Sequence, residues 1–139
     1  MESKDLETFG FNPWMRITNN YAHNGDLILK LPSEMGVYAI RADKLIPRIK
    51  GECDIIYIGQ GNIQSRIQSL LRSYLPSNLR NYWSKHPARG GVERVLKETK
   101  LNLELCFKES KTAQEIESKL LEGYCKDHIE APPLNNTRK

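Results

Sequence analysis

Three short runs of β-branched, aromatic and aliphatic residues mark the strands that we expect in this chain. Residues 36–41 and 53–59 are rich in valine, isoleucine and tyrosine and contain no proline, which is typical of β-strands. In residues 101–107, leucine and phenylalanine alternate mostly with polar residues, so this run predicts a strand with one buried face. We therefore expect a central sheet of three strands.

Three further segments carry apolar residues at helical spacing. The first, residues 62–75, opens with Asn62, whose side chain can accept a hydrogen bond from the first turn, and Pro76 ends it. The others are residues 92–99 and 112–127. The order of strands and helices predicts a small α/β (α+β) domain, in which a mostly antiparallel three-stranded sheet is flanked by helices.

The periodic part of the chain predicts one domain over residues 31–136. Residues 1–30 show little periodicity, and we expect them to form an N-terminal extension packed on that domain. Residues 137–139 are expected to be a loose tail.

Shorter elements are predicted from local signals. A short helix is expected around Trp14–Ile17, and the sequence Asn24–Asp26 indicates a turn. Residues 27–31 favour a short strand or an extended segment. Residues 43–50 contain a proline and predict an insertion with a helical turn.

Composition places the chain among soluble globular proteins. It has 139 residues, of which 39% are hydrophobic and 27% charged, and this size favours a single domain with its own core. No run approaches the roughly 20 apolar residues that a membrane span needs, and the acidic, polar start does not resemble a secretion signal. We therefore expect an intracellular, cytoplasmic protein. The cysteines are odd in number and form no Cys-x-x-Cys pair, which argues against structural zinc. They are Cys53, Cys106 and Cys125.

Positive charge is concentrated in the middle of the chain. Residues 41–100 hold twelve Lys/Arg against five Asp/Glu, a net charge of +7, whereas residues 1–40 carry −2 and residues 101–139 carry −1. This distribution suits a phosphate-rich partner. A solvated basic face without a partner is the alternative.

Basic and aromatic side chains alternate in residues 77–90, a combination that can contact both phosphates and bases. The 43–50 segment, with Lys44, Arg48 and Lys50, could contact a nucleic-acid backbone as well, or it could be a surface loop with no such role. Trp83 fits a position in the core equally well. The candidates for nucleic-acid contacts are Lys44, Arg48, Arg80, Trp83, Lys85, His86 and Arg89.

Two tripeptides on the first two predicted strands resemble a known motif. Gly36–Tyr38 and Tyr57–Gly59 are similar to the two halves of the GIY-YIG motif, which names a superfamily of metal-dependent DNA nucleases. The superfamily also has a downstream arginine, a glutamate on a later helix and a terminal Pro-x-Asn. Their counterparts are Arg66, Glu117 and Pro133–Asn135. The five elements occur in the same order as in the superfamily and span most of the chain.

One glutamate of the last predicted helix falls on its apolar face. On a helical wheel Glu117 lies within the apolar arc, whereas Glu115 and Glu122 lie on the opposite face. An unpaired carboxylate in a buried stripe costs several kcal/mol, so Glu117 must be paired, protonated or bound to a cation. A salt bridge to an arginine is the structural alternative to a metal ion. Thr112 and Glu115 have the spacing of a capping box at the start of this helix.

The resemblance implies a role for each matched residue. Glu117 would hold one divalent metal ion, Mg²⁺ or Mn²⁺, and Arg66 would donate to the phosphate oxygens. Tyr38 would position or deprotonate the attacking water, Tyr57 would orient the water or the phosphate, and Asn135 would lie near the active centre. The implied function is that of a metal-dependent endonuclease that hydrolyses DNA phosphodiester bonds in DNA repair, in a phage or in a mobile element.

The chain also departs from the superfamily's pattern. Many members have a lysine soon after YIG, whereas no lysine follows Gly59 at the corresponding place in this chain. Many also have a histidine four residues after the arginine, and this chain has Leu70 there. Arg66 follows Tyr57 by nine positions, one fewer than in the members considered. His86 or His128 could supply the missing imidazole.

These departures keep two other interpretations open. The first is a catalytically weak or inactive nucleic-acid-binding or protein-binding module with the same fold. The second is an unrelated α/β domain with a chance match, which predicts that the four matched side chains lie apart. No appended recognition domain is visible, so specificity would come from residues 77–90, from a homodimer or from a partner protein.

Overall fold

The computed structural model describes residues 1–80 and 85–136, which form an α+β fold with five helices, a four-stranded sheet and three short 3₁₀ turns. The helices are α1 (Ser3–Thr8), α2 (Tyr21–Lys30), α3 (Ile63–Leu70), α4 (Arg89–Glu98) and α5 (Ala113–His128). The strands are β1 (Met15–Ile17), β2 (Met35–Pro47), β3 (Glu52–Asn62) and β4 (Leu103–Glu109). The 3₁₀ turns span Arg72–Tyr74, Ser77–Leu79 and Pro133–Asn136.

The sheet has the strand order β1-β4-β2-β3, and every neighbouring pair is antiparallel. The prediction of three strands was wrong because β1 adds a fourth, with Met15 opposite Leu105 in β4. We expected a short helix around Trp14–Ile17. A strand of three residues is too short to show alternation in the sequence, and pairing with β4 decides its conformation.

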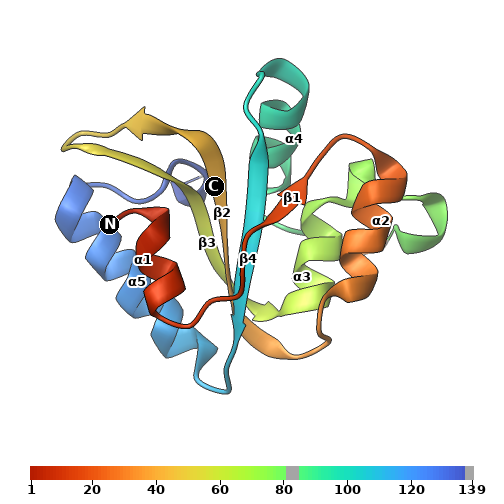
Figure 1. The fold of residues 1–139 in the computed structure, drawn as a ribbon, viewed down its shortest axis with the longest axis horizontal. Helices are drawn as coiled ribbons and strands as arrows, with labels where there is room; N and C mark the ends of the chain where they lie inside the picture. Colours follow the sequence, from red (N-terminus) through yellow and green to blue (C-terminus); the bar gives the residue numbers. More distant parts are fainter. Residues whose placement is uncertain (81–84, 137–139) are drawn as a thin grey trace.

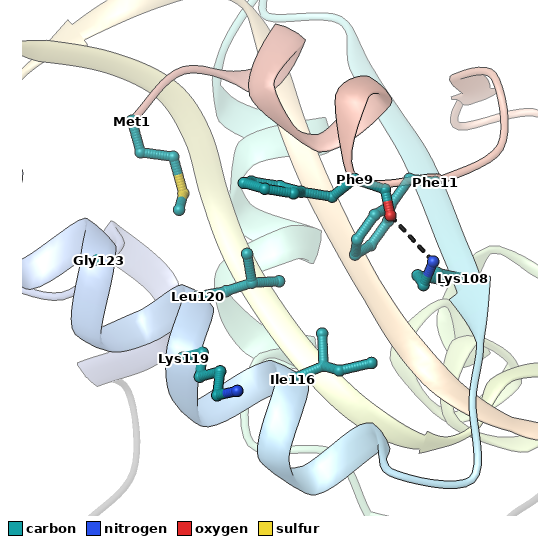
Figure 2. A pocket seen from close by; sticks show the side chains of 8 residues that line it. All are labelled: Met1, Phe9, Phe11, Lys108, Ile116, Lys119, Leu120 and Gly123. Carbon is teal, nitrogen blue, oxygen red and sulfur yellow. Dashed lines mark hydrogen bonds between the residues drawn. The ribbon is translucent and has the colours of Figure 1, made fainter.

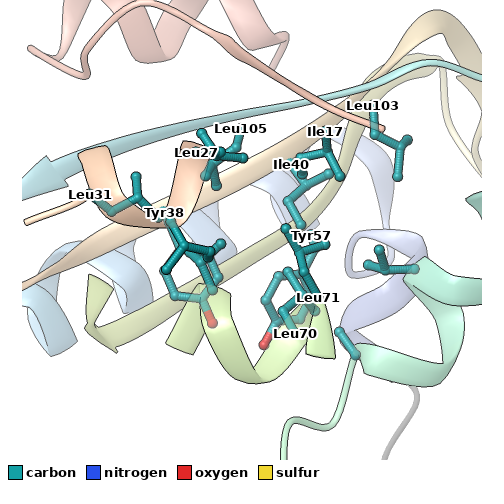
Figure 3. Close-up of a cluster of buried hydrophobic side chains, with 14 of the residues drawn as sticks. Ile17, Leu27, Leu31, Tyr38, Ile40, Tyr57, Leu70, Leu71, Leu103 and Leu105 are labelled. Atoms are coloured by element: carbon teal, nitrogen blue, oxygen red, sulfur yellow. The ribbon is translucent and has the colours of Figure 1, made fainter. Parts of the chain in front are cut away.

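Helices cover both faces of the sheet. Figure 1 shows α1 and α5 on one side of the strands and α2 and α3 on the other. Each side has its own core. One core joins side chains of β2, β3, α2, α3 and α4, and the other joins β2, β3, α1 and α5. Figure 3 shows that the first core contains both Tyr38 and Tyr57. The candidate site is therefore built on the α2–α3 side of the sheet.

The turn at residues 24–26 and the strand at residues 27–31 are both replaced by the single helix α2. The side chain of Asn24 is buried and accepts a hydrogen bond from the Thr18 amide, while its amide donates to the carbonyls of Thr18 and Tyr74. The Asn24 side chain thus makes hydrogen bonds with the backbone of two neighbouring loops rather than within a local turn. Tertiary contacts override its turn propensity.

The 43–50 segment is not an inserted helical turn. Strand β2 continues to Pro47 after an irregularity between Arg41 and Ile46, so β2 and β3 form a long hairpin. A turn closes this hairpin, in which the Arg48 amide donates to the carbonyl of Gly51, a residue with positive φ. Local sequence signals did not reveal this extension because the irregularity interrupts its alternation.

The boundaries of the other elements follow the predictions within a few residues. The Asn62 cap is confirmed, since its side chain accepts a hydrogen bond from the Ser65 amide at 3.0 Å. Helix α3 ends at Leu70, and a separate 3₁₀ turn follows. The capping box of α5 does not form, because Ser110, rather than Glu115, accepts the hydrogen bond from the Thr112 amide.

Residues 1–30 contribute to the sheet and to both cores. Leu6 lies in the α1–α5 core, whereas Ile17 and Leu27 lie in the α2–α3 core. Residues 137–139, predicted to be a loose tail, lie outside the described part of the chain. Within that part, no helix is long and apolar enough to cross a membrane.

Candidate active site

The β2–β3 hairpin brings two tyrosines together on one face of the sheet. Tyr38 lies opposite Gly59, and Tyr57 lies opposite Ile40, so the tyrosines are diagonal neighbours across the strand pair. Their ring centroids are 6.0 Å apart. In Figure 3 both hydroxyl groups point to the same side of the sheet. The register of the hairpin therefore creates the centre of the candidate site.

Gly59 makes room for both rings. A Cβ atom at this position would lie 2.6 Å from Cζ of Tyr38 and 2.7 Å from Cε2 of Tyr57. Contacts this short are not tolerated by aromatic carbons, so any side chain at residue 59 would displace the tyrosines. The glycine that ends the second half of the motif thus has a steric function.

A third ring, that of His86, completes this cluster. Its Nε2 lies 2.6 Å from the Tyr38 hydroxyl oxygen, and its ring centroid lies 5.4 Å from that of Tyr57. Nδ1 accepts a hydrogen bond from the Ala88 amide at 3.0 Å. Since Nδ1 is an acceptor, the proton of the neutral imidazole must be on Nε2. His86 therefore donates to the oxygen of Tyr38, and the hydroxyl proton of Tyr38 is left for another acceptor.

Burial keeps both members of this pair uncharged. Desolvation raises the pKa of Tyr38 well above its usual value, the charge of Tyr57 adds to this, and Arg66 acts in the opposite direction. Desolvation lowers the pKa of His86 to about 3, and the positive charges of Arg66 and Arg89 reinforce the shift. At neutral pH, Tyr38 is a phenol and His86 is a neutral imidazole.

Arg66 extends from the first turn of α3 toward these rings. Desolvation raises the pKa of Tyr38 and of Tyr57, and the positive charge of Arg66 opposes the rise in both. One guanidinium nitrogen donates to the Lys85 carbonyl at 3.2 Å. Gly61 has a φ of +138°, and a Cβ atom there would lie 2.9 Å from Cγ of Arg66. This glycine therefore permits the path of the arginine side chain.

Glu117 approaches the same cluster from α5. The helix packs on β3 and β2, and β3 is an edge strand, so groups from both faces of the sheet can meet along its open edge. The negative charge of Glu117 raises the pKa of Tyr57, although desolvation of Tyr57 contributes more to that shift. Burial also raises the pKa of Glu117 itself.

No hydrogen bond or ion pair joins Glu117 to another residue in the described ranges 1–80 and 85–136. The expected alternative, a salt bridge from Glu117 to an arginine, is therefore absent there. The carboxylate is half-buried rather than deeply buried. A partly buried carboxylate without a partner is stabilised by binding a cation or by taking up a proton.

Asn135 is bound to the middle of the second tripeptide. Its side-chain oxygen accepts from the Ile58 amide at 3.0 Å, and its side-chain nitrogen donates to the Ile58 carbonyl at 2.8 Å. Because β3 is an edge strand, these two bonds replace those that a further strand would make. Asn135 thus fixes the backbone next to Tyr57 and has a positioning role.

Two of the basic candidates lie next to the cluster. Lys85 is exposed, and its carbonyl accepts the bond from Arg66. Nε of Arg89 donates to the Ser69 carbonyl at 2.7 Å, and its charge acts on His86. Both residues are therefore placed where a bound polyanion could reach them.

The other basic candidates are placed differently. Arg48 is only 10% exposed, and it binds Glu130 at 2.9 Å and the Ala131 carbonyl at 2.8 Å, so it serves to join the hairpin to the end of α5. Arg80 donates to the Leu75 carbonyl and lies over the ring of Tyr21.

Three remaining candidates complete this comparison. Lys44 is exposed near the C-terminal end of β2, whereas Tyr38 lies near its start. Trp83 lies outside the described residues. His128 is buried against Tyr124, and its Nδ1 lies 2.8 Å from the Lys50 carbonyl, whereas His86 contacts Tyr38 and Tyr57 and is the histidine at the site. The sequence offered both histidines as alternatives, and only the fold distinguishes them.

Potential metal ligands are few at the site. In the part of the chain that the structure describes, no group of three or more His, Cys, Asp or Glu side chains could hold a metal ion. Glu117 offers one carboxylate. Mg²⁺ keeps several water ligands and is often bound by one or two carboxylates together with substrate phosphates, so one carboxylate fits this mode of binding.

Comparison of the chain with protein-family models, with curated proteins and with solved structures found no match. A function must therefore be inferred from the site itself. The observations available for that inference are the grouping of Tyr38, Tyr57, Arg66 and His86, and the carboxylate of Glu117, which has no partner within residues 1–80 and 85–136.

Proposed function

We propose that this protein is a GIY-YIG-type, metal-dependent endonuclease that hydrolyses phosphodiester bonds in DNA. The observation that carries the proposal is that Tyr38 and Tyr57 pack together and that the charges of Arg66 and Glu117 both act on Tyr57, although the four residues come from four different elements. A chance match of the motif predicts that these side chains lie apart. This arrangement therefore supports the motif as one functional unit.

Arg66 is the phosphate-binding group of the proposed site. Its planar guanidinium can donate two parallel hydrogen bonds to phosphate oxygens. One nitrogen of this guanidinium donates to the Lys85 carbonyl, and the other N–H groups can serve a ligand. The arginine is therefore suited to stabilise the negative charge that develops on the phosphate.

Tyr38 acts as an oriented phenol rather than as a free base. Its oxygen accepts a hydrogen bond from His86, and its raised pKa keeps the hydroxyl proton in place. The hydroxyl can therefore donate to a water molecule or a phosphate oxygen at a fixed position. Tyr57 is less buried than Tyr38, and its hydroxyl would help to orient the same water molecule or phosphate.

Glu117 would hold the divalent metal ion, with Mg²⁺ or Mn²⁺ as the suitable ions. When bound, such an ion supplies Lewis-acid stabilisation of charge on the phosphate and on the leaving oxygen. Glu117 contributes a carboxylate that has no partner among the described residues, and its partial burial makes its charge costly without a cation. Substrate phosphate and water would complete the ligands.

The surroundings of the site favour a nucleic-acid substrate. Lys85 and Arg89 lie beside Arg66 and His86, within the segment of the chain that has a net charge of +7. Such a group of cations can neutralise several phosphates and would make binding dependent on salt. The choice of DNA over RNA follows from the resemblance to the superfamily. A homodimer or a partner protein would supply further specificity.

One observation favours a second function, that of a catalytically weak or inactive nucleic-acid-binding or protein-binding module. Tyr38 has no exposed surface, and its oxygen is already bonded to His86. A water molecule reaches this hydroxyl only if neighbouring side chains shift. In this second function, the basic residues would retain binding while the reaction is slow or absent.

A plasmid-nicking assay with Mg²⁺, Mn²⁺ or EDTA, paired with a DNA-binding assay, separates the two functions. We expect nicking that requires metal and is lost in Arg66→Ala. Arg94→Ala is the matched control, because Arg94 is an exposed arginine in a surface pair with Glu98. Salt-sensitive DNA binding without nicking would support the binding module. Metal-independent nicking that Arg66→Ala leaves unchanged would contradict the nuclease assignment.

A further inference from the structure

An apolar groove lies on the sheet face opposite to the tyrosine cluster. It runs between α5 and the N-terminal segment that contains α1, and its volume is about 450 Å³ (Figure 2). The side chain of Phe9 is 56% exposed beside it. Together with the other apolar side chains that line the groove, this ring forms a contiguous apolar surface, and such surfaces often mark ligand-binding grooves. The lining residues are Met1, Phe9, Phe11, Lys108, Ile116, Lys119, Leu120 and Gly123.

The only charged side chains that line the groove are two lysines, and no carboxylate lines it among the described residues. The ammonium group of Lys108 donates to the Phe9 carbonyl at 2.9 Å. Gly10, with a φ of +89°, leaves room for this contact, because a Cβ atom there would lie 2.8 Å from Nζ of Lys108. Lys119 is exposed on α5 and forms no ion pair within the described part of the chain.

The size of the groove indicates what it can hold. A specific protein–protein interface involves about 20 to 30 residues on each side, whereas eight residues line this groove. Its volume lies within the range of small-molecule sites, which are mostly apolar with a few polar groups that fix the orientation of the ligand. A small molecule therefore fits these observations better than a partner protein.

We propose that this groove binds a small anionic amphiphile of the medium-chain carboxylate class. The aliphatic chain would lie against Phe9, Ile116 and Leu120, and the carboxylate would be bound by Lys119 (Figure 2). Apolar walls supply affinity through burial of methylene groups, the Lys119 ammonium selects a negative head group, and Lys108 on the other side of the groove adds to its positive charge. The proposal does not depend on the proposed nuclease activity.

Calorimetric titration with hexanoate, octanoate and decanoate tests the proposal, with decylammonium as the probe of opposite charge. We expect affinity to rise about fourfold for each added methylene while the chain still fits. Decylammonium should bind roughly tenfold more weakly than decanoate, because the lysines repel it. Equal binding of the two decyl probes, or no binding of decanoate, would overturn the proposal.

Gly123→Leu tests the location of the site. A Cβ atom at residue 123 meets only the end of the Met1 side chain, at 3.5 Å, so leucine can enter the groove and should abolish decanoate binding. The replacement of a glycine within a helix also favours folding, and circular dichroism checks that α5 is retained. Decanoate binding that persists in this variant would place the site elsewhere and refute the assignment.

Charge reversal tests the head-group contact. Lys119→Glu should weaken decanoate binding roughly fivefold. Lys126→Glu is the matched control, because Lys126 is also exposed on α5 but does not line the groove. The affinity of this variant for decanoate should equal that of the unaltered protein. Equal effects of the two substitutions would show that only net charge matters and would contradict a defined carboxylate site.

Discussion

Replacement of Gly59 by alanine should destabilise the protein and disorganise the candidate site together. The new methyl group would lie 2.6 Å from Cζ and 2.7 Å from the hydroxyl oxygen of Tyr38, and 2.7 Å from Cε2 of Tyr57. These contacts are about 1 Å shorter than the optimal separation of non-bonded carbon atoms. Both rings belong to the core, so neither can move away freely.

The expected cost is that of an overpacked core, about 1–3 kcal/mol. Gly90→Ala is the matched control, because a Cβ atom at residue 90 meets nothing within 4 Å and the residue lies in α4. Alanine in a helix is favoured over glycine by roughly 0.5–1 kcal/mol, so this variant should be slightly more stable than the unaltered protein.

Urea unfolding, followed by circular dichroism, measures both free energies of unfolding. We expect the two variants to differ by about 1.5–4 kcal/mol, with a lower midpoint for Gly59→Ala. Loss of DNA cleavage should accompany the change at Gly59, because Tyr38 would lose its position against His86. A Gly59→Ala variant as stable as Gly90→Ala would refute the steric role assigned to this glycine.

Further predictions concern the residues around the tyrosine cluster. Asn135→Ala removes two hydrogen bonds from Ile58 and should lower the free energy of unfolding by about 1–3 kcal/mol in urea, and an unchanged midpoint would contradict the positioning role. The pKa of His86 is lowered from 6.5 to about 3 in the folded protein, so the unfolded chain binds more protons between these values. Stability should therefore be fully present above pH 6.5 and fall by up to about 1.4 kcal/mol per pH unit toward pH 3, and His86→Gln should lose this part of the pH dependence. Arg48→Ala should destabilise the protein without changing the salt dependence of DNA binding, whereas Lys85→Ala should weaken binding and reduce the salt slope by about one; the opposite pattern would reverse their assigned roles.

The sequence predicted the elements that carry the motif because their signals are local. The central parts of β2 and β3, residues 37–40 and 55–58, are continuous apolar runs, and the Asn62 cap marks the start of α3 through a side chain that bonds within its own first turn. The place of Glu117 on α5 could also be predicted, since helical periodicity relates it to Ile116 and Leu120. Such features need no knowledge of tertiary contacts.

The features that the sequence did not reveal depend on distant contacts. Strand β1 exists because it pairs with β4, and α2 contains Asn24 because two loops supply hydrogen-bond partners for its side chain. The contact between His86 and Tyr38 joins residues 48 positions apart in the chain. No local pattern distinguishes His86 from His128 as the histidine of the site.

The most direct test of the proposed nuclease is the rate of plasmid nicking by Glu117→Gln in the presence of Mg²⁺ or Mn²⁺. This substitution retains the shape of the side chain and removes the charge that a metal ion requires. Glu115→Gln is the control, because Glu115 is an exposed glutamate of the same helix. We predict that Glu117→Gln loses on the order of 10²–10³ in rate, whereas Glu115→Gln retains the rate of the unaltered protein. Equal nicking by the two variants would contradict a metal-dependent site at Glu117.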